Sequence, residues 1–229
     1  CDWSSDVCSS DLENRNFRPS SVAVAPDGSL YVMDWSQMLI GHLQHHRRDP
    51  NRDHQHGRIY RLTYPSRPLL QPKKIHGEPV EKLLDLLKEH EDSTRQLAKI
   101  QLDTHESKVV IDAVTKWEKA LDRSDKSFEH HRLEALWVHQ WHNNVNPELL
   151  DAVLKSPEPR ARAQAVRVAC YWMDRLPNAI GIFEAAIKDS APRVRLEAVR
   201  ALSFIKGEQV KKAIELAKLV MPEKEDRKS

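Results

Sequence analysis

A short pattern recurs four times in the C-terminal part of the chain and limits the folds open to it. Each copy begins with arginine and has alanine three positions later: Arg95-Gln-Leu-Ala, Arg132-Leu-Glu-Ala, Arg162-Ala-Gln-Ala and Arg195-Leu-Glu-Ala. Successive arginines are 37, 30 and 33 residues apart. A repeat of this length is one supersecondary unit that buries its apolar face only against its neighbours. Because alanine lets a neighbouring helix approach closely, the pattern predicts an α-solenoid.

Apolar spacing within the repeat region has the period of an α-helix. Two stretches each place their apolar residues on one helical face: Val80, Leu83, Leu84 and Leu87, then Val110, Ala113, Val114, Trp117 and Leu121. Residue types that begin helices recur at Asp92, Asn146, Pro157, Pro177 and Pro192. We therefore predict a mostly α fold in which residues 78–221 form about four helix pairs, with about nine short helices. Residues 222–229 are expected to be a solvated, frayed tail.

The segment before the repeats has the alternation of β-strands. Two alternating apolar runs, Val22 to Val24 and Leu30 to Val32, flank Pro26-Asp27-Gly28, a tripeptide suited to a tight turn. This pattern predicts a β-hairpin, and a further strand follows Gly57. We assign residues 13–65 to this β-structure and 66–77 to an extended linker. Prolines, which fix φ and lack an N–H, punctuate that stretch at Pro65, Pro68, Pro72 and Pro79.

Residues 1–12, CDWSSDVCSSDL, match one reading frame of a common sequencing adapter, and we interpret them as a translated artefact. Cys1 and Cys8 are then not evolved residues, so no disulfide is expected. Cys170 remains, in an apolar helical run, where a buried small hydrophobe is favoured over a nucleophile. On this interpretation the natural sequence begins inside a domain near Glu13.

The composition, 40% hydrophobic and 31% charged, is that of a water-soluble domain. No apolar run approaches the roughly 18 residues that a membrane span needs, so no span is expected. Positive charge is concentrated between Ser36 and His76, with eight Lys or Arg against two Asp. A nucleic-acid binder would use such charge, and its affinity would fall steeply with salt. The stretch has too few aromatic residues for base stacking, so no nucleic-acid partner is expected.

The most unusual stretch, RRDPNRDHQHGRIYR, runs from Arg47 to Arg61. Its candidate binding residues are Arg48, Arg52, Asp53, His54, His56 and Arg58. One interpretation is structural, with the arginines paired to Asp49, Asp53 or Asp34 to hold a long loop. Another is a metal site formed by the loop's histidines and aspartates, with the rings of His54 and His56 on one side of an extended segment. The histidines are His42, His45, His46, His54 and His56. Their spacing matches no usual zinc pattern, so no metal is assigned.

The series FRPSSVAVAPDGSLYVMDW followed by RDPNRDHQHGRIYR resembles the end of the β-propeller in PVC-type CxxCH haem-binding, dehydrogenase-like proteins. The propellers of that family are similar to those of quinone-dependent sugar dehydrogenases. Such proteins continue into HEAT repeats and then a c-type cytochrome domain. The repeat region of this chain resembles the HEAT repeats, from roughly Pro79 to Val220. The chain contains no Cys-x-x-Cys-His motif, so it cannot itself attach a c-type haem.

The resemblance implies that residues 13–65 are the hairpin and strand remnant of a truncated β-propeller from a periplasmic or otherwise exported oxidoreductase. It places the loop at the propeller mouth, where Arg48, Arg52, Asp53, His54, His56 and Arg58 would contact substrate or quinone. It implies pyrroloquinoline quinone with calcium in the parent protein and haem c on a domain outside this chain. That cytochrome domain would be a partner within the parent. No catalytic residue is assigned, and this chain alone is expected to be inactive and to hold no cofactor.

Other features have structural interpretations. Trp137 and Trp141, in helical register with Leu133, are predicted to lie in the solenoid core. The histidines of the same region are predicted to be solvated or to cap helices: His130, His131, His139 and His142. Ala198 is predicted to lie in the seam between repeats, with Glu197 beside it on the solvent side.

Two function hypotheses follow. In the first, which the resemblance favours, the repeats are the scaffold of a multidomain oxidoreductase. In the alternative, the chain is a HEAT-repeat interaction protein without catalysis that holds a protein partner on the concave face of the solenoid. Redox chemistry of the intact gene product would discriminate between them.

Overall fold

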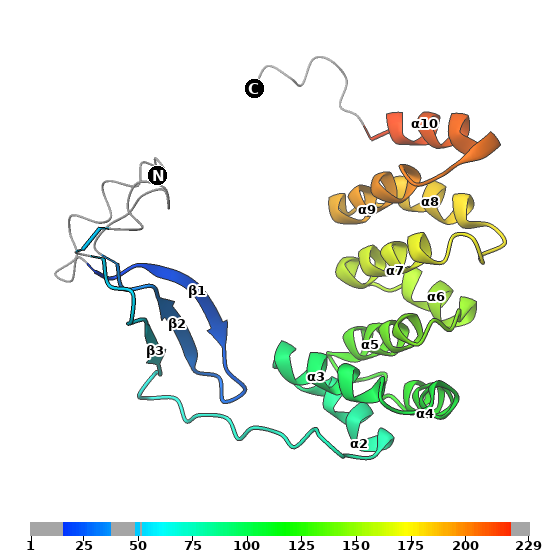
Figure 1. Ribbon diagram of the computed structural model, residues 1–229. Helices are drawn as coiled ribbons and strands as arrows, with labels where there is room; N and C mark the ends of the chain where they lie inside the picture. The colour runs from blue at the N-terminus through cyan, green and yellow to red at the C-terminus, as the bar shows by residue number, and fades with distance from the viewer. Residues whose placement is uncertain (1–15, 38–48, 51, 221–229) are drawn as a thin grey trace. The chain divides into compact units, whose positions relative to one another are not determined.

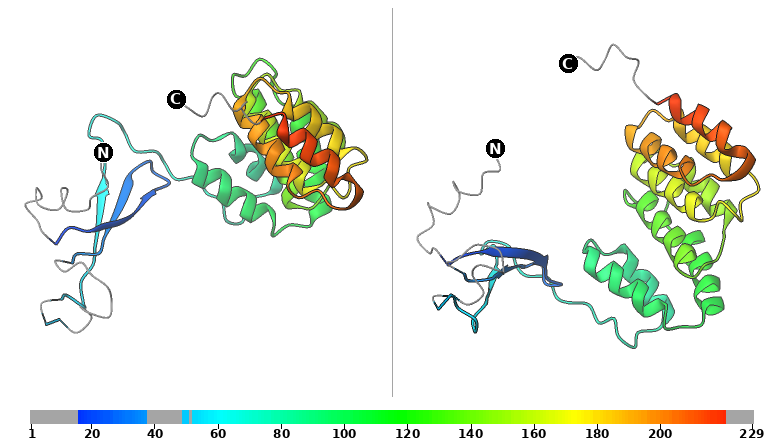
Figure 2. Two further views of the ribbon diagram at one scale, coloured as in Figure 1. Left: turned by 90° about the horizontal axis from the view of Figure 1, so that it is seen from above. Right: turned by 45° about the horizontal axis from the view of Figure 1, so that its top comes forward.

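A computed structural model describes residues 16–37, 49–50 and 52–220 (Figure 1). The chain divides into two compact units at about residue 74, and a short segment, 90–94, is grouped with the first unit. The first unit contains a small β-sheet and the second contains the helices (Figure 2). None of the helices in the described ranges is both long enough and apolar enough to cross a membrane.

The sheet is an antiparallel meander of three strands in the order β1-β2-β3. Strand β1 (Pro19–Val24) pairs with β2 (Leu30–Asp34), which pairs with β3 (Arg58–Leu62). The predicted turn between β1 and β2 forms as expected, since the N–H of Gly28 donates to the Ala25 carbonyl at 2.9 Å. Gly28 has φ of +79°, a left-handed conformation that glycine adopts without strain. The predicted hairpin is therefore confirmed.

Apolar side chains of the sheet unit remain exposed to solvent. The most exposed are Val22, Val24, Trp35, Ile59, Leu62 and Tyr64, with exposed fractions of 49–69%. Beyond β3 the chain has no helix or strand until Val80, and the N–H of Leu70 donates to the carbonyl of Asp27 at 2.9 Å. The sheet thus has little core of its own, and part of the proline-rich linker packs against its turn.

The second unit is a row of helix pairs (Figure 1). The first helices of the pairs are α2 (Val80–Asp85), α4 (Ser107–Lys119), α6 (Pro147–Leu154) and α8 (Ala179–Ile187). The second helices are α3 (Asp92–Leu102), α5 (Phe128–Trp141), α7 (Pro159–Tyr171) and α9 (Pro192–Leu202). A further helix, α10 (Val210–Lys218), packs on α8 and α9. The predicted solenoid of nine helices is confirmed for the described residues.

Two of the predicted helix starts are confirmed, and two are wrong. Asn146 caps α6 through a hydrogen bond of 3.0 Å from the N–H of Leu149, and Pro192 occupies the first turn of α9, both as predicted. Helix α7 begins at Pro159, with Glu158 as its cap, and α8 begins after Asn178. Pro157 and Pro177 therefore precede these two caps, and their predicted first-turn positions are wrong.

The core of the solenoid is built from residues of both rows of helices. Alanines let α7 and α9 approach closely, and Ala165, Ala169, Ala198 and Ala201 are completely buried. The predicted seam position of Ala198 is confirmed. On the other side of the repeats, α6 and α8 make few contacts, and a cavity of about 370 Å³ lies between them, lined by Leu154, Val166 and Ile182 among others. Packing is therefore tight between α7 and α9 and loose between α6 and α8.

Candidate functional site

Arg52, the best-placed candidate in the loop after β2, is buried. Its guanidinium carbon lies 5.3 Å from the centroid of the Trp35 ring, which is a cation–π arrangement. Its Nε and Nη2 atoms are buried without a hydrogen-bond partner. An aromatic ring, and not one of the aspartates that were predicted, therefore holds Arg52. Arg48, His42, His45 and His46 lie outside the described residues.

Asp53 shapes the loop through local hydrogen bonds. Its Oδ1 atom accepts the N–H of Gln55 at 2.9 Å and that of His56 at 3.1 Å, and the Nδ1 atom of His56 lies 2.9 Å from Oδ2. The bond from Gln55 is the largest of the effects that lower the pKa of Asp53 below its ordinary 3.8. The chain bends at His54 and Gln55, so the extended segment predicted for His54 and His56 does not form.

Asp34 and Arg58 also depart from the predicted salt-bridged loop. The Oδ1 atom of Asp34 accepts the main-chain N–H groups of Arg18 at 2.6 Å and Ser36 at 2.8 Å. Arg58 is exposed on β3. Among residues 49–50 and 52–220, neither Arg52 nor Arg58 pairs with an aspartate, and the predicted clasp is not formed there. The same part of the chain contains no group of three His, Cys, Asp or Glu side chains arranged to hold a metal ion.

In the solenoid, the repeated arginine closes the turn before its own helix. In three repeats its Nη1 atom donates to the carbonyl six residues earlier: Arg95 to Glu89 at 2.6 Å, Arg162 to Ser156 at 2.9 Å and Arg195 to Asp189 at 2.9 Å. Arg132 differs, since it donates to the Ala152 carbonyl in α6 at 3.1 Å. The sequence pattern showed the repeat but not this role.

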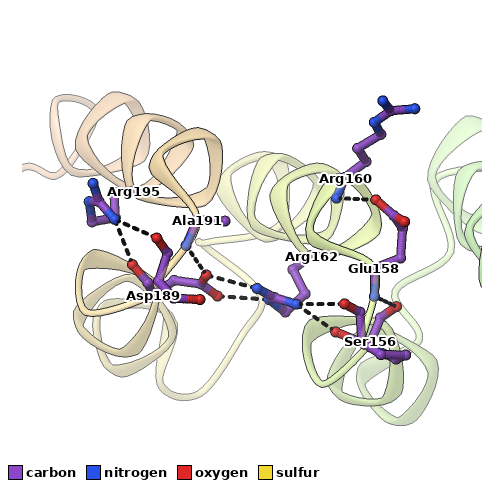
Figure 3. Close-up of polar contacts among 9 residues, drawn as sticks. Ser156, Glu158, Arg160, Arg162, Asp189, Ala191 and Arg195 are labelled. Atoms are coloured by element: carbon purple, nitrogen blue, oxygen red, sulfur yellow. Dashed lines mark hydrogen bonds and ion pairs between the residues drawn. The ribbon is translucent and has the colours of Figure 1, made fainter.

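The arginine of one repeat also reaches the turn of the next repeat (Figure 3). The Nε and Nη2 atoms of Arg162 donate to the two carboxylate oxygens of Asp189 at 2.7 and 2.8 Å. Asp189 also accepts the N–H of Ala191, just before α9, at 2.8 Å. The bond from Arg162 lowers the pKa of Asp189, although desolvation partly opposes it. We call the Arg162 and Asp189 pair the inter-repeat latch.

Two glutamates two positions after the repeated arginine are almost fully buried. Glu134 accepts from Arg95 at 3.0 Å and from Lys99 at 2.8 Å, which links α5 to α3. Glu197 lies at the centre of three arginines, which we call the arginine cluster: Arg167 at 3.4 Å, Arg193 at 3.4 Å and Arg200 at 3.7 Å. The prediction that Glu197 faces solvent is wrong, because its carboxylate turns toward these guanidinium groups.

We predicted that His139 is solvated or caps a helix, but the structure shows that it is buried. Its Nδ1 atom lies 2.9 Å from the Asn144 Oδ1 atom, and its Nε2 atom lies 3.3 Å from the amide nitrogen of Asn146, the cap of α6. A neutral ring with the proton on Nδ1 satisfies both contacts. Burial lowers the pKa of His139, which favours this neutral form. His131 is buried as well, and burial also lowers its pKa. It is therefore not solvated, which was one of the two roles predicted for it.

Exposed aromatic rings line the side of the solenoid formed by α5, α7 and α9, which we call the second-helix face. Nine positions after the repeated arginine stand Trp141, Tyr171 and Phe204, with exposed fractions of 42%, 56% and 51%. The prediction that Trp141 is in the core is wrong, whereas Leu133 is buried and Trp137 packs partly against the core.

Two features on the second-helix face could receive a ligand. The guanidinium carbon of Arg200 lies 5.9 Å from the Tyr171 ring centroid and 5.5 Å from that of Phe204, so one cation joins the rings of two successive repeats. Near α5, a cavity of about 440 Å³ is lined by Gln96, Lys99, Trp137, Gln140 and Trp141. Tyrosine, tryptophan and arginine are residue types enriched at protein–protein interfaces.

Cys170, the cysteine in the described part of the chain, has no catalytic setting. It is a free thiol buried in α7, and burial raises its pKa above the ordinary value. A raised pKa disfavours the nucleophilic thiolate. The predicted role as a small buried hydrophobe is confirmed.

Comparisons with known families match two parts of the chain. A domain of unknown function, DUF7133, matches residues 5–66, a range that includes most of the segment interpreted as adapter sequence. HEAT repeats match residues 146–227. Neither the curated proteins nor the solved structures gave a match. The second unit is thus a helical-repeat scaffold that is similar to HEAT repeats.

Proposed function

We propose that the helical repeats act as a rigid scaffold that holds a protein segment within a multidomain oxidoreductase. The observation that carries the scaffold role is that the buried ion pairs of the solenoid connect successive repeats. The inter-repeat latch and the Glu134 pairs with Arg95 and Lys99 each join one repeat to the next. Such charges fix the geometry between repeats, and the second-helix face stays open to solvent.

The oxidoreductase part of the proposal rests on the sheet unit and its resemblance to a quinoprotein propeller. A propeller blade has four antiparallel strands, and an antiparallel meander of three strands with exposed apolar residues fits an incomplete blade. In this proposal the parent protein is exported, and its c-type cytochrome domain accepts the electrons.

The described loop residues fit the implied cofactors only in part. Arg52 has two buried nitrogen atoms, Nε and Nη2, whose N–H groups have no partner, and it fits an anion, such as a carboxylate of pyrroloquinoline quinone. Asp53 is already used by Gln55 and His56, and the described residues offer no ligand set for calcium. We therefore assign only Arg52 as a group that would contact the quinone. When bound, the quinone would supply the electron-accepting chemistry.

The experiment is dye-linked oxidation of sugars and alcohols by the intact gene product, supplied with pyrroloquinoline quinone and calcium. We expect the intact product to reduce the dye and this chain alone not to do so. An Arg52→Gln variant of the intact product should need more quinone for half-maximal activity, and Arg67→Gln, in the linker, is the charge-matched control. If a folded intact product reduces no dye with any substrate, the oxidoreductase proposal is wrong and the alternative, an interaction scaffold without catalysis, remains.

A further inference from the structure

We propose that the second-helix face binds an extended, acidic segment of a protein, with carboxylates on the arginine cluster and apolar side chains against the exposed rings. This inference rests on the proposed scaffold function and names the chemistry of the partner. It depends on the contacts of α5, α7 and α9, which pack in that order.

The arginine cluster has more positive charge than its carboxylate neutralises. Arg167, Arg193 and Arg200 surround one carboxylate, that of Glu197, so two of the three positive charges are uncompensated at this point. The Glu197 side chain is buried, whereas the three arginine side chains are 41%, 60% and 33% exposed. Each guanidinium has five N–H groups. The cluster therefore has donors facing solvent that suit further carboxylates.

The aromatic rings beside the cluster are arranged for an extended chain. Tyr171 and Phe204 belong to successive repeats and flank Arg200, and Trp141 occupies the same place in the preceding repeat. Packed helices lie about 8–10 Å apart, so the three rings span roughly 16–20 Å. An extended chain advances about 3.3 Å per residue, so about six residues would cover this distance. The cavity at Trp137 and Trp141 would receive an apolar side chain at one end.

The distribution of charge favours an acidic peptide over a nucleic acid. The exposed arginines of the face are on α7 and α9, whereas the α5 part presents Trp141 and the glutamine Gln140. Lys99, the cation nearest to Trp137, is bound to the buried Glu134. Nucleic-acid binding needs positive charge that continues along the strand. A short acidic segment needs positive charge only at the arginine cluster.

The test uses the full chain and a fluorescein-labelled peptide of about ten residues in which pairs of glutamates alternate with pairs of phenylalanines. Because successive side chains of an extended chain point to opposite sides, this pattern places both residue types on each side. Binding is followed by fluorescence anisotropy, beside a lysine and phenylalanine peptide and a labelled oligothymidylate. We expect the acidic peptide to bind more tightly than the other two probes, and added salt to weaken it. The Arg167→Gln/Arg200→Gln and Tyr171→Ala/Phe204→Ala double variants should each weaken binding by about tenfold or more.

The matched control is Lys155→Gln/Lys188→Gln, which removes the same charge from positions just after α6 and α8. It should bind like the unchanged protein. Circular dichroism checks that each variant is folded. If the arginine double variant unfolds, Arg193→Gln replaces it, because Arg193 is the most exposed member of the cluster.

Three results would overturn the proposal: no binding of the acidic peptide to the folded chain, binding by both double variants as tight as by the unchanged protein, or tighter binding of oligothymidylate. Preferential binding of the lysine peptide to this face would reject an acidic partner and leave the scaffold function standing. The oxidoreductase role is tested separately by the dye assay, so the two failures are distinguishable.

Discussion

Replacing Asp189 by alanine should lower the free energy of unfolding by about 3 kcal/mol. The substitution removes two charge-assisted hydrogen bonds from Arg162 and the bond from the N–H of Ala191. Hydrogen bonds to charged groups contribute about 1.5–3 kcal/mol, and a capping side chain contributes about 1 kcal/mol. The two side chains are only 17% and 15% exposed, so solvent screening is limited and Arg162 would be left partly desolvated.

Asp151→Ala is the control, because it removes a carboxylate whose pair with Lys155 is exposed. It should change the free energy of unfolding by less than about 0.5 kcal/mol. Both variants are measured by urea unfolding of the full chain, followed by far-ultraviolet circular dichroism at about pH 7. Equal urea midpoints for Asp189→Ala and Asp151→Ala would refute a stabilising latch.

The pH dependence of the latch gives a second check. The pKa of Asp189 is lower in the folded than in the unfolded protein. The carboxylate therefore makes its full contribution to the free energy of unfolding at pH values above the ordinary pKa of 3.8. The contribution is lost as the pH falls below 3.8 toward the folded pKa, because the unfolded chain then binds the proton more readily. Asp189→Asn keeps an acceptor for Ala191 but has no charge to titrate. Its stability should therefore fall less steeply with acid than that of the unchanged protein.

Further predictions concern the seam, the buried ionisable groups and the independence of the repeats. Ala198→Leu should destabilise by about 1–3 kcal/mol in urea unfolding because the close contact of α9 is overfilled, whereas Leu196→Ala, at an exposed position, should cost less than about 0.5 kcal/mol. Glu197→Ala should cost about 2 kcal/mol or more, since three arginines lose their shared carboxylate; a change below about 0.5 kcal/mol would contradict this. Burial lowers the pKa of His139, so the unfolded chain binds its proton more readily, and stability should fall as the pH drops below the ordinary pKa of 6.5. If the stability of His139→Gln depends on pH as steeply as that of the unchanged protein, His139 is not the cause of this loss. Residues 77–229 expressed alone should give a helical circular dichroism spectrum, and a disordered spectrum would mean that the repeats need the sheet unit.

The sequence predicted the start of a helix or the position of a turn correctly where a single residue type determines the local backbone conformation. Asn146 followed by proline marked the start of α6, and Gly28 marked the turn of the hairpin. The same reasoning failed at Pro157 and Pro177, because proline is also favourable just before a cap. Glu158 and Asn178 accept N–H groups from their helices, so both helices begin two residues after these prolines.

The candidate sites were harder to predict because they depend on contacts between distant residues. Glu197 has the polar character of a surface residue, and its burial depends on Arg167 from the preceding repeat. In the loop, Arg52 was expected beside a carboxylate and lies instead over Trp35, 17 positions earlier in the chain. The spacing of charges along a sequence does not distinguish these outcomes. The three exposed aromatics, in contrast, could have been found by extending the repeat alignment nine positions past the arginine.

The unequal packing of α6 to α9 makes this part of the solenoid mechanically anisotropic. Pulling α7 away from α9 would break the close alanine contacts and the inter-repeat latch together. Tilting α8 relative to α6 would mainly change the volume of the cavity between them, at little cost in packing. The α7 and α9 pair is therefore stiff, whereas α6 and α8 can tilt more easily. Bending at this point would open or close the space between α6 and α8 and would leave the spacing of Tyr171 and Phe204 nearly constant.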